Sequence, residues 1–86
     1  MKLRRNPSVY SKKVDGKWLI LEPDKQHIRE LNETADFVWG ATQKPIEVST
    51  IIKRLAKAYL LPPEQCKKDV EEFVRRYLRE KLLLPA

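Results

Sequence analysis

Residues 26–42, with the sequence QHIRELNETADFVWGAT, contain the change of hydrophobic period that decides the fold. Residues 26–31 follow a turn signal and are predicted to form a short strand. Asn32 is a good helix N-cap, because its side-chain oxygen can accept from backbone N–H groups of the next turn. The residues that follow have the helical spacing i, i+3, i+4 and i+7: Ala35, Val38, Trp39 and Thr42. The stretch therefore predicts a strand that leads directly into a helix near residues 33–42.

Upstream of this stretch the sequence predicts two further strands. Residues 9–14 and 17–22 flank Asp15-Gly16, a strong signal for a two-residue hairpin turn because glycine adopts a positive φ without strain. Residues 23–25, Pro-Asp-Lys, are predicted to form the next turn, since proline fixes φ near −65°. Together with residues 26–31, these segments predict a three-stranded antiparallel meander.

Downstream, two more helices are predicted. The second, near residues 47–59, has an apolar stripe made of Val48, Ile51, Ile52, Leu55 and Tyr59. Pro62-Pro63 interrupts the pattern, and Pro63 suits the first turn of a third helix that runs to about Leu82. The apolar side of that helix contains Cys66, Val70, Phe73, Val74, Tyr77 and Leu78. We expect one α+β domain, residues 1–86, with a winged-helix-like order β-β-β-α-α-α.

The composition argues against several kinds of catalytic site. Cys66 is the only cysteine and His27 the only histidine, so neither a disulfide framework nor a multi-cysteine metal site is available. The two glycines are 24 positions apart, which leaves no glycine-rich phosphate loop. His27 is interpreted as a solvated strand residue and Cys66 as a small buried one. We therefore expect a binding protein rather than an enzyme, with no metal and no cofactor.

No segment predicts export or membrane insertion. The longest apolar stretches, residues 18–21 and 82–84, are far shorter than the roughly 20 residues needed to cross a bilayer. The N-terminus, residues 1–7, is basic but has no apolar segment behind it, so a secretory signal is not expected. The chain is predicted to be cytoplasmic and not to bind membranes.

The positive charge is concentrated at the N-terminus. Of the net charge of +6, residues 1–17 carry +5, residues 18–60 carry zero and residues 61–86 carry +1. A nucleic-acid reader of this size more usually concentrates its lysines and arginines on a recognition helix. The third predicted helix instead interleaves both signs, which is typical of a solvated face. Nucleic-acid binding therefore stays an alternative rather than the first interpretation.

The second predicted strand is apolar on both faces. Trp18 and Ile20 point to one side, and Leu19 and Leu21 to the other. Helices on one side of the sheet would bury only one of these pairs. The second face is expected to be covered by the N-terminal arm, a second copy of the chain or a partner, which leaves a homodimer open.

Leu31-Asn32-Glu33-Thr34-Ala35, followed by Trp39, resembles the PqqD family. This is the small chaperone fold of pyrroloquinoline quinone biosynthesis and of the recognition elements for ribosomally made, modified peptides (RiPPs). The likeness continues at the family's distances through Ile51, Leu55, Ala56, Tyr59, Pro63-Glu64, Asp69-Val70, Phe73 and residues 81–83. Two positions depart from the pattern: Leu60 stands where the family usually has a helix-ending glycine, and Pro62 replaces a common polar cap.

The resemblance implies that the chain binds the leader segment of a precursor peptide and delivers the attached core to a leader protease or another modifying enzyme. A free-standing domain of this kind is similar to PqqD and to the discrete leader-binding protein of lasso-peptide pathways. We favour the lasso interpretation because the Arg-Arg-Asn-Pro arm, residues 4–7, and the Asp15-Gly16 hairpin look more like it. The alternative is a PqqD-type chaperone for a radical enzyme in quinone cofactor biosynthesis.

A physical mechanism for peptide binding can be predicted from the strands alone. An edge strand at residues 26–31 would offer roughly 20 Å of unpaired backbone, to which an extended peptide can add as a fourth antiparallel strand. The third helix would form the opposite wall, and Arg29 and Lys81 would hold acidic leader residues. The predicted peptide-binding residues are Gln26, His27, Ile28, Arg29, Glu30, Leu31, Val70, Phe73, Val74, Tyr77 and Lys81.

Overall fold

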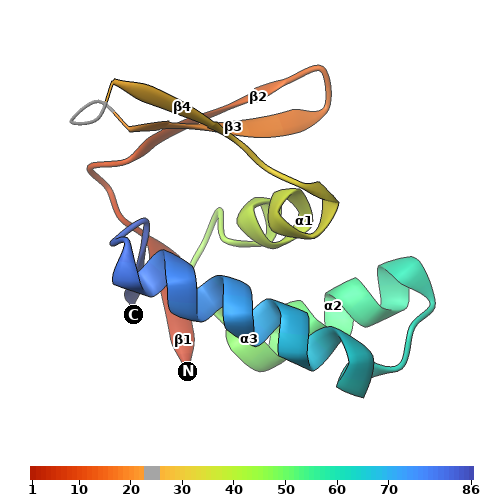
Figure 1. The fold of residues 1–86 in the computed structure, drawn as a ribbon. Helices are drawn as coiled ribbons and strands as arrows, with labels where there is room; N and C mark the ends of the chain where they lie inside the picture. Colours follow the sequence, from red (N-terminus) through yellow and green to blue (C-terminus); the bar gives the residue numbers. More distant parts are fainter. Residues whose placement is uncertain (23–25) are drawn as a thin grey trace.

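The computed structural model describes residues 1–22 and 26–86, so the turn predicted at residues 23–25 lies outside the described residues. Along the chain the elements are β1 (Lys2–Arg5), β2 (Tyr10–Val14), β3 (Lys17–Glu22), β4 (His27–Glu30), α1 (Glu33–Ala41), β5 (Ile46–Glu47), α2 (Val48–Tyr59), α3 (Pro63–Arg79) and β6 (Leu83–Pro85) (Figure 1). The α+β class and the three helices are confirmed. The predicted order β-β-β-α-α-α is incomplete, because three short strands were not predicted.

The predicted meander is present as the sheet β2-β3-β4, with both pairs antiparallel. Asp15 and Gly16 have φ values of 51° and 80°, as a two-residue turn between twisted strands requires. The first and third strands are shorter than predicted, since β2 begins at Tyr10 and β4 covers only residues 27–30. Order within the sheet places β4 at its edge.

A second antiparallel sheet has the order β5-β1-β6. Its central strand is the N-terminal segment, in which Leu3 lies opposite Ile46 and Arg4 lies opposite Leu84. The N-terminal arm therefore does not cover the free face of the meander, as one interpretation allowed; it is buried elsewhere, and Leu3 is fully buried in the core. Strand β6 also corrects the predicted end of the third helix, because α3 stops at Arg79.

The helix boundaries follow local signals. The Asn32 side chain accepts a hydrogen bond from the backbone N–H of Ala35 at 2.8 Å, which caps α1 as predicted. Helix α2 ends at Tyr59, and its C-cap residue, Leu60, has a left-handed conformation. Pro63 occupies the first turn of α3, where its missing N–H removes no helical hydrogen bond.

Helix α1 lies between the meander on one side and α2 and α3 on the other (Figure 1). The core that these layers enclose draws on both sheets and all three helices, from Leu3 to Leu83. At its centre the ring of Trp39 from α1 meets that of Tyr77 from α3 edge-to-face, with 6.1 Å between centroids. This packing fixes the position of α3 relative to α1, and thereby the gap between α3 and β4.

Candidate functional site

Strand β4 exposes one side of its backbone. It pairs with β3 on the other side, and in the described part of the chain no further strand pairs with it. The pair Val14–Lys17, which closes the two-residue turn, is a hydrogen-bonded pair. From it, hydrogen-bonded and non-hydrogen-bonded pairs alternate along the strands. By this alternation Arg29 directs its backbone groups to β3, whereas Ile28 and Glu30 direct theirs to the open edge. The prediction that this segment is an edge strand is confirmed, and the backbone groups of Ile28 and Glu30 are the ones that an added strand would meet.

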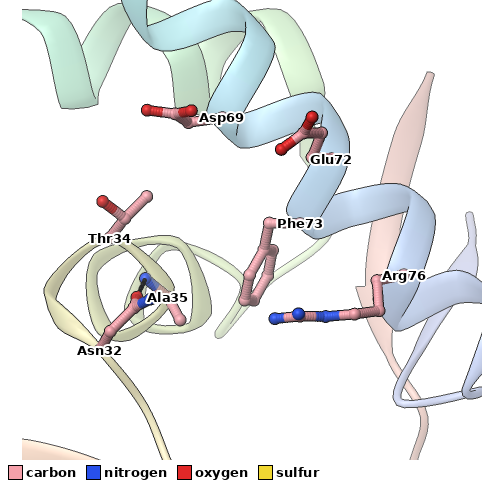
Figure 2. Close-up of a pocket in the computed structure, with 7 residues that line it drawn as sticks. All are labelled: Asn32, Thr34, Ala35, Asp69, Glu72, Phe73 and Arg76. Atoms are coloured by element: carbon pink, nitrogen blue, oxygen red, sulfur yellow. Dashed lines mark hydrogen bonds between the residues drawn. The ribbon is translucent and has the colours of Figure 1, made fainter.

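Beside this edge a groove runs between β4, the start of α1, and α3. Its first half has a volume of about 370 Å³, and its second half, drawn in Figure 2, about 360 Å³. The first half is lined by Arg29, Glu30, Leu31, Asn32, Ala35, Arg76, Tyr77 and Glu80. The second is lined by Asn32, Thr34, Ala35, Asp69, Glu72, Phe73 and Arg76. Because the halves share three residues, we treat them as one feature, the β4–α3 groove.

The groove combines an apolar floor with a charged rim. Phe73 and Tyr77 are almost wholly buried, and their rings lie 3.9 Å apart, centroid to centroid. Figure 2 shows Phe73 lying between α3 and α1, with the guanidinium of Arg76 reaching from α3 toward α1 beside it. Asp69 and Glu72 contribute carboxylates to the second half. Such a floor favours an apolar side chain, and the rim favours particular charges beside it.

Arg29 ties the edge strand to α3. Its Nη1 donates to Oε2 of Glu80 at 2.6 Å, and its Nε donates to Oε2 of Glu22 at 3.4 Å. Burial by itself lowers the pKa of Arg29, but the hydrogen bond and charge of Glu80, reinforced by Glu22, outweigh burial and raise it. The predicted role for Arg29, holding an acidic leader residue, therefore meets competition: two carboxylates of this chain already bind the guanidinium.

The structure brings together five of the residues predicted for the site. Arg29, Glu30, Leu31, Phe73 and Tyr77 all line the β4–α3 groove. Gln26, His27 and Ile28 lie on or next to the edge strand and are exposed. The register places Ile28 opposite Leu21, on the face of the meander that points away from Arg29.

Three other predicted residues lie outside the groove lining. Val70 and Val74 belong to the core beneath α3. Lys81 is exposed in the turn after α3, with a φ of 60°. The residues that the prediction missed are Asn32, Thr34, Ala35, Asp69, Glu72, Arg76 and Glu80. Helical spacing could have indicated two of them, because Arg76 and Glu80 each follow a predicted aromatic residue by three positions.

Within residues 1–22 and 26–86 no three His, Cys, Asp or Glu side chains gather closely enough to hold a metal ion. Over the same ranges, none of the helices has the length and apolar character that spanning a bilayer requires.

An antiparallel meander with an open edge beside a long, apolar-faced helix defines a small α+β domain that can accept an extended polypeptide. The chain belongs to the PqqD family: the family model described as coenzyme PQQ synthesis protein D matches residues 17–83. The match runs from the first residue of β3 to the first residue of β6. No curated protein sequence gives a significant match to the chain.

Three solved structures share this fold. TbiB1 in complex with the TbiA(beta) leader peptide has a TM-score of 0.80 and 17% identity, covering 93% of both chains. A lasso peptide synthetase B1 complexed with the leader peptide also has a TM-score of 0.80 and 17% identity, covering 96% of this chain and 98% of that one. The PqqD truncation of Methylobacterium extorquens PqqCD, described as a functional and stand-alone RiPP recognition element, has a TM-score of 0.75 and 19% identity. That match covers 96% of this chain and 88% of the other.

Proposed function

We propose that this protein binds the leader segment of a ribosomally made precursor peptide, which adds as a strand to the open edge of β4. The observation that carries the proposal is the unpaired edge at Ile28 and Glu30, which opens onto the β4–α3 groove. The same fold occurs in two proteins whose structures contain a bound leader peptide. Residues 1–86 would act as one peptide-binding domain.

The energetics of such binding separate affinity from selectivity. Backbone hydrogen bonds to β4 would each contribute about 0.5–1.5 kcal/mol, whatever the sequence of the peptide. Selectivity must come from side chains. An apolar side chain buried over Phe73 and Tyr77 would contribute about 1.5–3 kcal/mol. The groove is therefore suited to an extended peptide with at least one large apolar residue directed toward α3.

Three finer points belong to the same proposal. The lasso pathway is favoured by the similarity to a lasso peptide synthetase B1, whereas the family and the PqqD neighbour support the alternative, a PqqD-type chaperone for a radical enzyme. The protein would not be catalytic, and it would present the attached core to a leader protease or another modifying enzyme. It would act in the cytoplasm, where its single thiol, Cys66, stays reduced.

Two substitutions of Ile28 can test whether the open edge of β4 binds the peptide. A dodecapeptide ligand is first selected from a random displayed library against the immobilised protein and then titrated while backbone amides are followed by NMR. We expect the largest shifts at residues 27–30. Ile28→Pro removes the edge N–H without removing a bond to β3, and it should weaken binding about 3- to 10-fold relative to Ile28→Ala, which keeps the N–H.

Two results would contradict the proposed site. One is a selected peptide that binds with unchanged amides in β4. The other is equal binding by the proline and alanine variants, since the backbone donor of Ile28 would then play no part.

A further inference from the structure

Two arginines line the β4–α3 groove, and in the described part of the chain only Arg29 is paired with carboxylates. The guanidinium of Arg29 is bound by the carboxylates of Glu22 and Glu80. Arg76 lines both halves of the groove, and in residues 1–22 and 26–86 no carboxylate lies within 4 Å of it. Two glutamates lie one helical turn from Arg76, but neither forms an ion pair with it in the described structure. Glu80 pairs with Arg29 instead, and Glu72 lies beyond ion-pair distance of Arg76. Among the described residues, Arg76 is therefore a groove-lining cation whose guanidinium has no carboxylate partner.

The surroundings of Arg76 favour the binding of a carboxylate. Its guanidinium carbon lies 5.8 Å from the centroid of the Tyr77 ring, and its side chain reaches beside Phe73 (Figure 2). Arg76 is exposed in the free protein, but a peptide strand on β4 would cover its guanidinium, so a carboxylate held there would be screened less than one on an open surface. The planar fork of arginine also matches a carboxylate with two parallel hydrogen bonds.

We infer that Arg76 selects peptides carrying one acidic side chain, which it binds where the two halves of the groove meet. The inference rests on the proposed function, since it assumes a peptide strand on β4. It names the chemistry of that peptide: an aspartate or glutamate close to the large apolar residue that covers Phe73 and Tyr77.

The acidic rim of the groove limits which residues can precede the selected acidic residue in the peptide. The half of the groove near the start of α1 contains Asp69 and Glu72, which would repel a second carboxylate. A strand antiparallel to β4 passes that half first and the half containing Glu80 afterwards, because β4 runs toward α1. Residues on the N-terminal side of the selected acid should therefore be neutral or basic.

The test is a charge exchange read out by peptide selection. Random dodecapeptides displayed on phage are selected against the wild type, Arg76→Gln, Arg76→Glu and the control Arg75→Glu. Arg75 is exposed on the same helix but lines neither half of the groove. The wild type and the control should enrich Asp or Glu at one aligned position. Arg76→Gln should lose this preference, and Arg76→Glu should enrich Lys or Arg at the same position.

A measured affinity completes the test. Replacing the selected Glu by Gln in a wild-type ligand should weaken binding to the wild type about tenfold, and binding to Arg76→Gln less than twofold. Peptides that shift the β4 amides but show no acidic preference would overturn the inference and leave the proposed function standing. Selected peptides that leave the β4 amides unchanged would overturn both. Because Arg76 is exposed, Arg76→Gln should unfold close to the temperature of the wild type, whereas Arg76→Glu should unfold slightly lower, since its new carboxylate lies one helical turn from Glu72 and from Glu80.

Discussion

Arg5 joins the two sheets through its guanidinium. The guanidinium carbon lies 4.6 Å from the ring centroid of Trp18 and 4.5 Å from that of Trp39, so it is placed between a meander residue and an α1 residue. Its Nε also donates to Oγ1 of Thr42 at 3.1 Å. Burial lowers the pKa of Arg5 to about 10, which still leaves it charged at neutral pH. From the sequence, Arg5 is predicted only as one of the positive charges of the N-terminal arm. Composition cannot reveal that its guanidinium stacks on residues distant in the chain.

Replacing Arg5 by lysine should therefore destabilise the fold even though the charge is kept. Lysine has a compact ammonium group, which cannot stack between two rings and donate to Thr42 at once. We expect Arg5→Lys to lower the free energy of unfolding by about 1–3 kcal/mol in urea denaturation. Arg4→Lys, at the exposed neighbouring position of β1, should change it by less than about 0.5 kcal/mol. If Arg5→Lys lowered the free energy of unfolding as little as Arg4→Lys does, Arg5 would act only through its charge.

At the scale of elements, predictions from the sequence succeed where the signal is local. The Asn32 cap, the Asp15-Gly16 turn and the proline start of α3 each depend on a few adjacent residues, and each is present. Strands β5 and β6 depend instead on pairing with β1, across about 40 and 80 residues of chain, and are too short to give a periodic pattern. The groove shows the same division: the edge strand was predicted, but its helical wall was predicted only in part.

That partial success has a physical reason in α3. The apolar side chains of α3 cover an arc wide enough to face both the core and the groove. The packing of α1 against α3 determines which of them are buried in the core and which line the groove. Val70 and Val74 are drawn into the core, whereas Phe73 and Tyr77 reach both. No pattern within the helix distinguishes these two pairs, since the distinction depends on contacts with another element.

Leu60, between α2 and α3, is a position where local conformation and residue type disagree. It has φ 54° and ψ 45°, and its side chain is 91% exposed, so burial does not compensate for the left-handed backbone. Leu60→Gly should therefore raise the free energy of unfolding by about 0.5–1 kcal/mol. Ala58→Gly, an exposed position inside α2, should lower it by a similar amount. Destabilisation by both substitutions, measured in urea, would mean that the Leu60 side chain makes a stabilising contact.

On the scale of the whole molecule, one apolar surface has no cover from the described chain. The register places Tyr10, Leu21 and Ile28 in one row across the outer face of the meander, with Leu19 in the next row. Tyr10 and Ile28 are each 59% exposed, and Leu19 and Leu21 are not among the partly buried side chains packed on the core. Because β1 belongs to the second sheet, a second copy or a partner remains as the cover.

The pattern of charges on this face suits a second copy. A two-fold axis parallel to β3 would lay β2 of one molecule over β4 of the other, so that Lys12 meets Glu30 and Tyr10 meets Ile28. Lys12 and Glu30 are both level with Leu19 in the register, so the opposite charges lie on either side of Leu19, in the row next to Tyr10, Leu21 and Ile28. The edge of β4 would stay open in such a dimer, since the contact uses the face of the sheet.

We therefore predict weak self-association through the outer face. The row of three apolar side chains is small beside the roughly 1,200 Å² that stable complexes bury, so dimers are expected only at high protein concentration. Sedimentation equilibrium should show concentration-dependent dimers for the wild type and monomers for Tyr10→Lys, which adds a charge to the apolar row. Lys13→Glu, on the opposite face of the same strand, is the matched control and should still dimerise. A wild type that stays monomeric at 1 mM would exclude a second copy as the cover of this face.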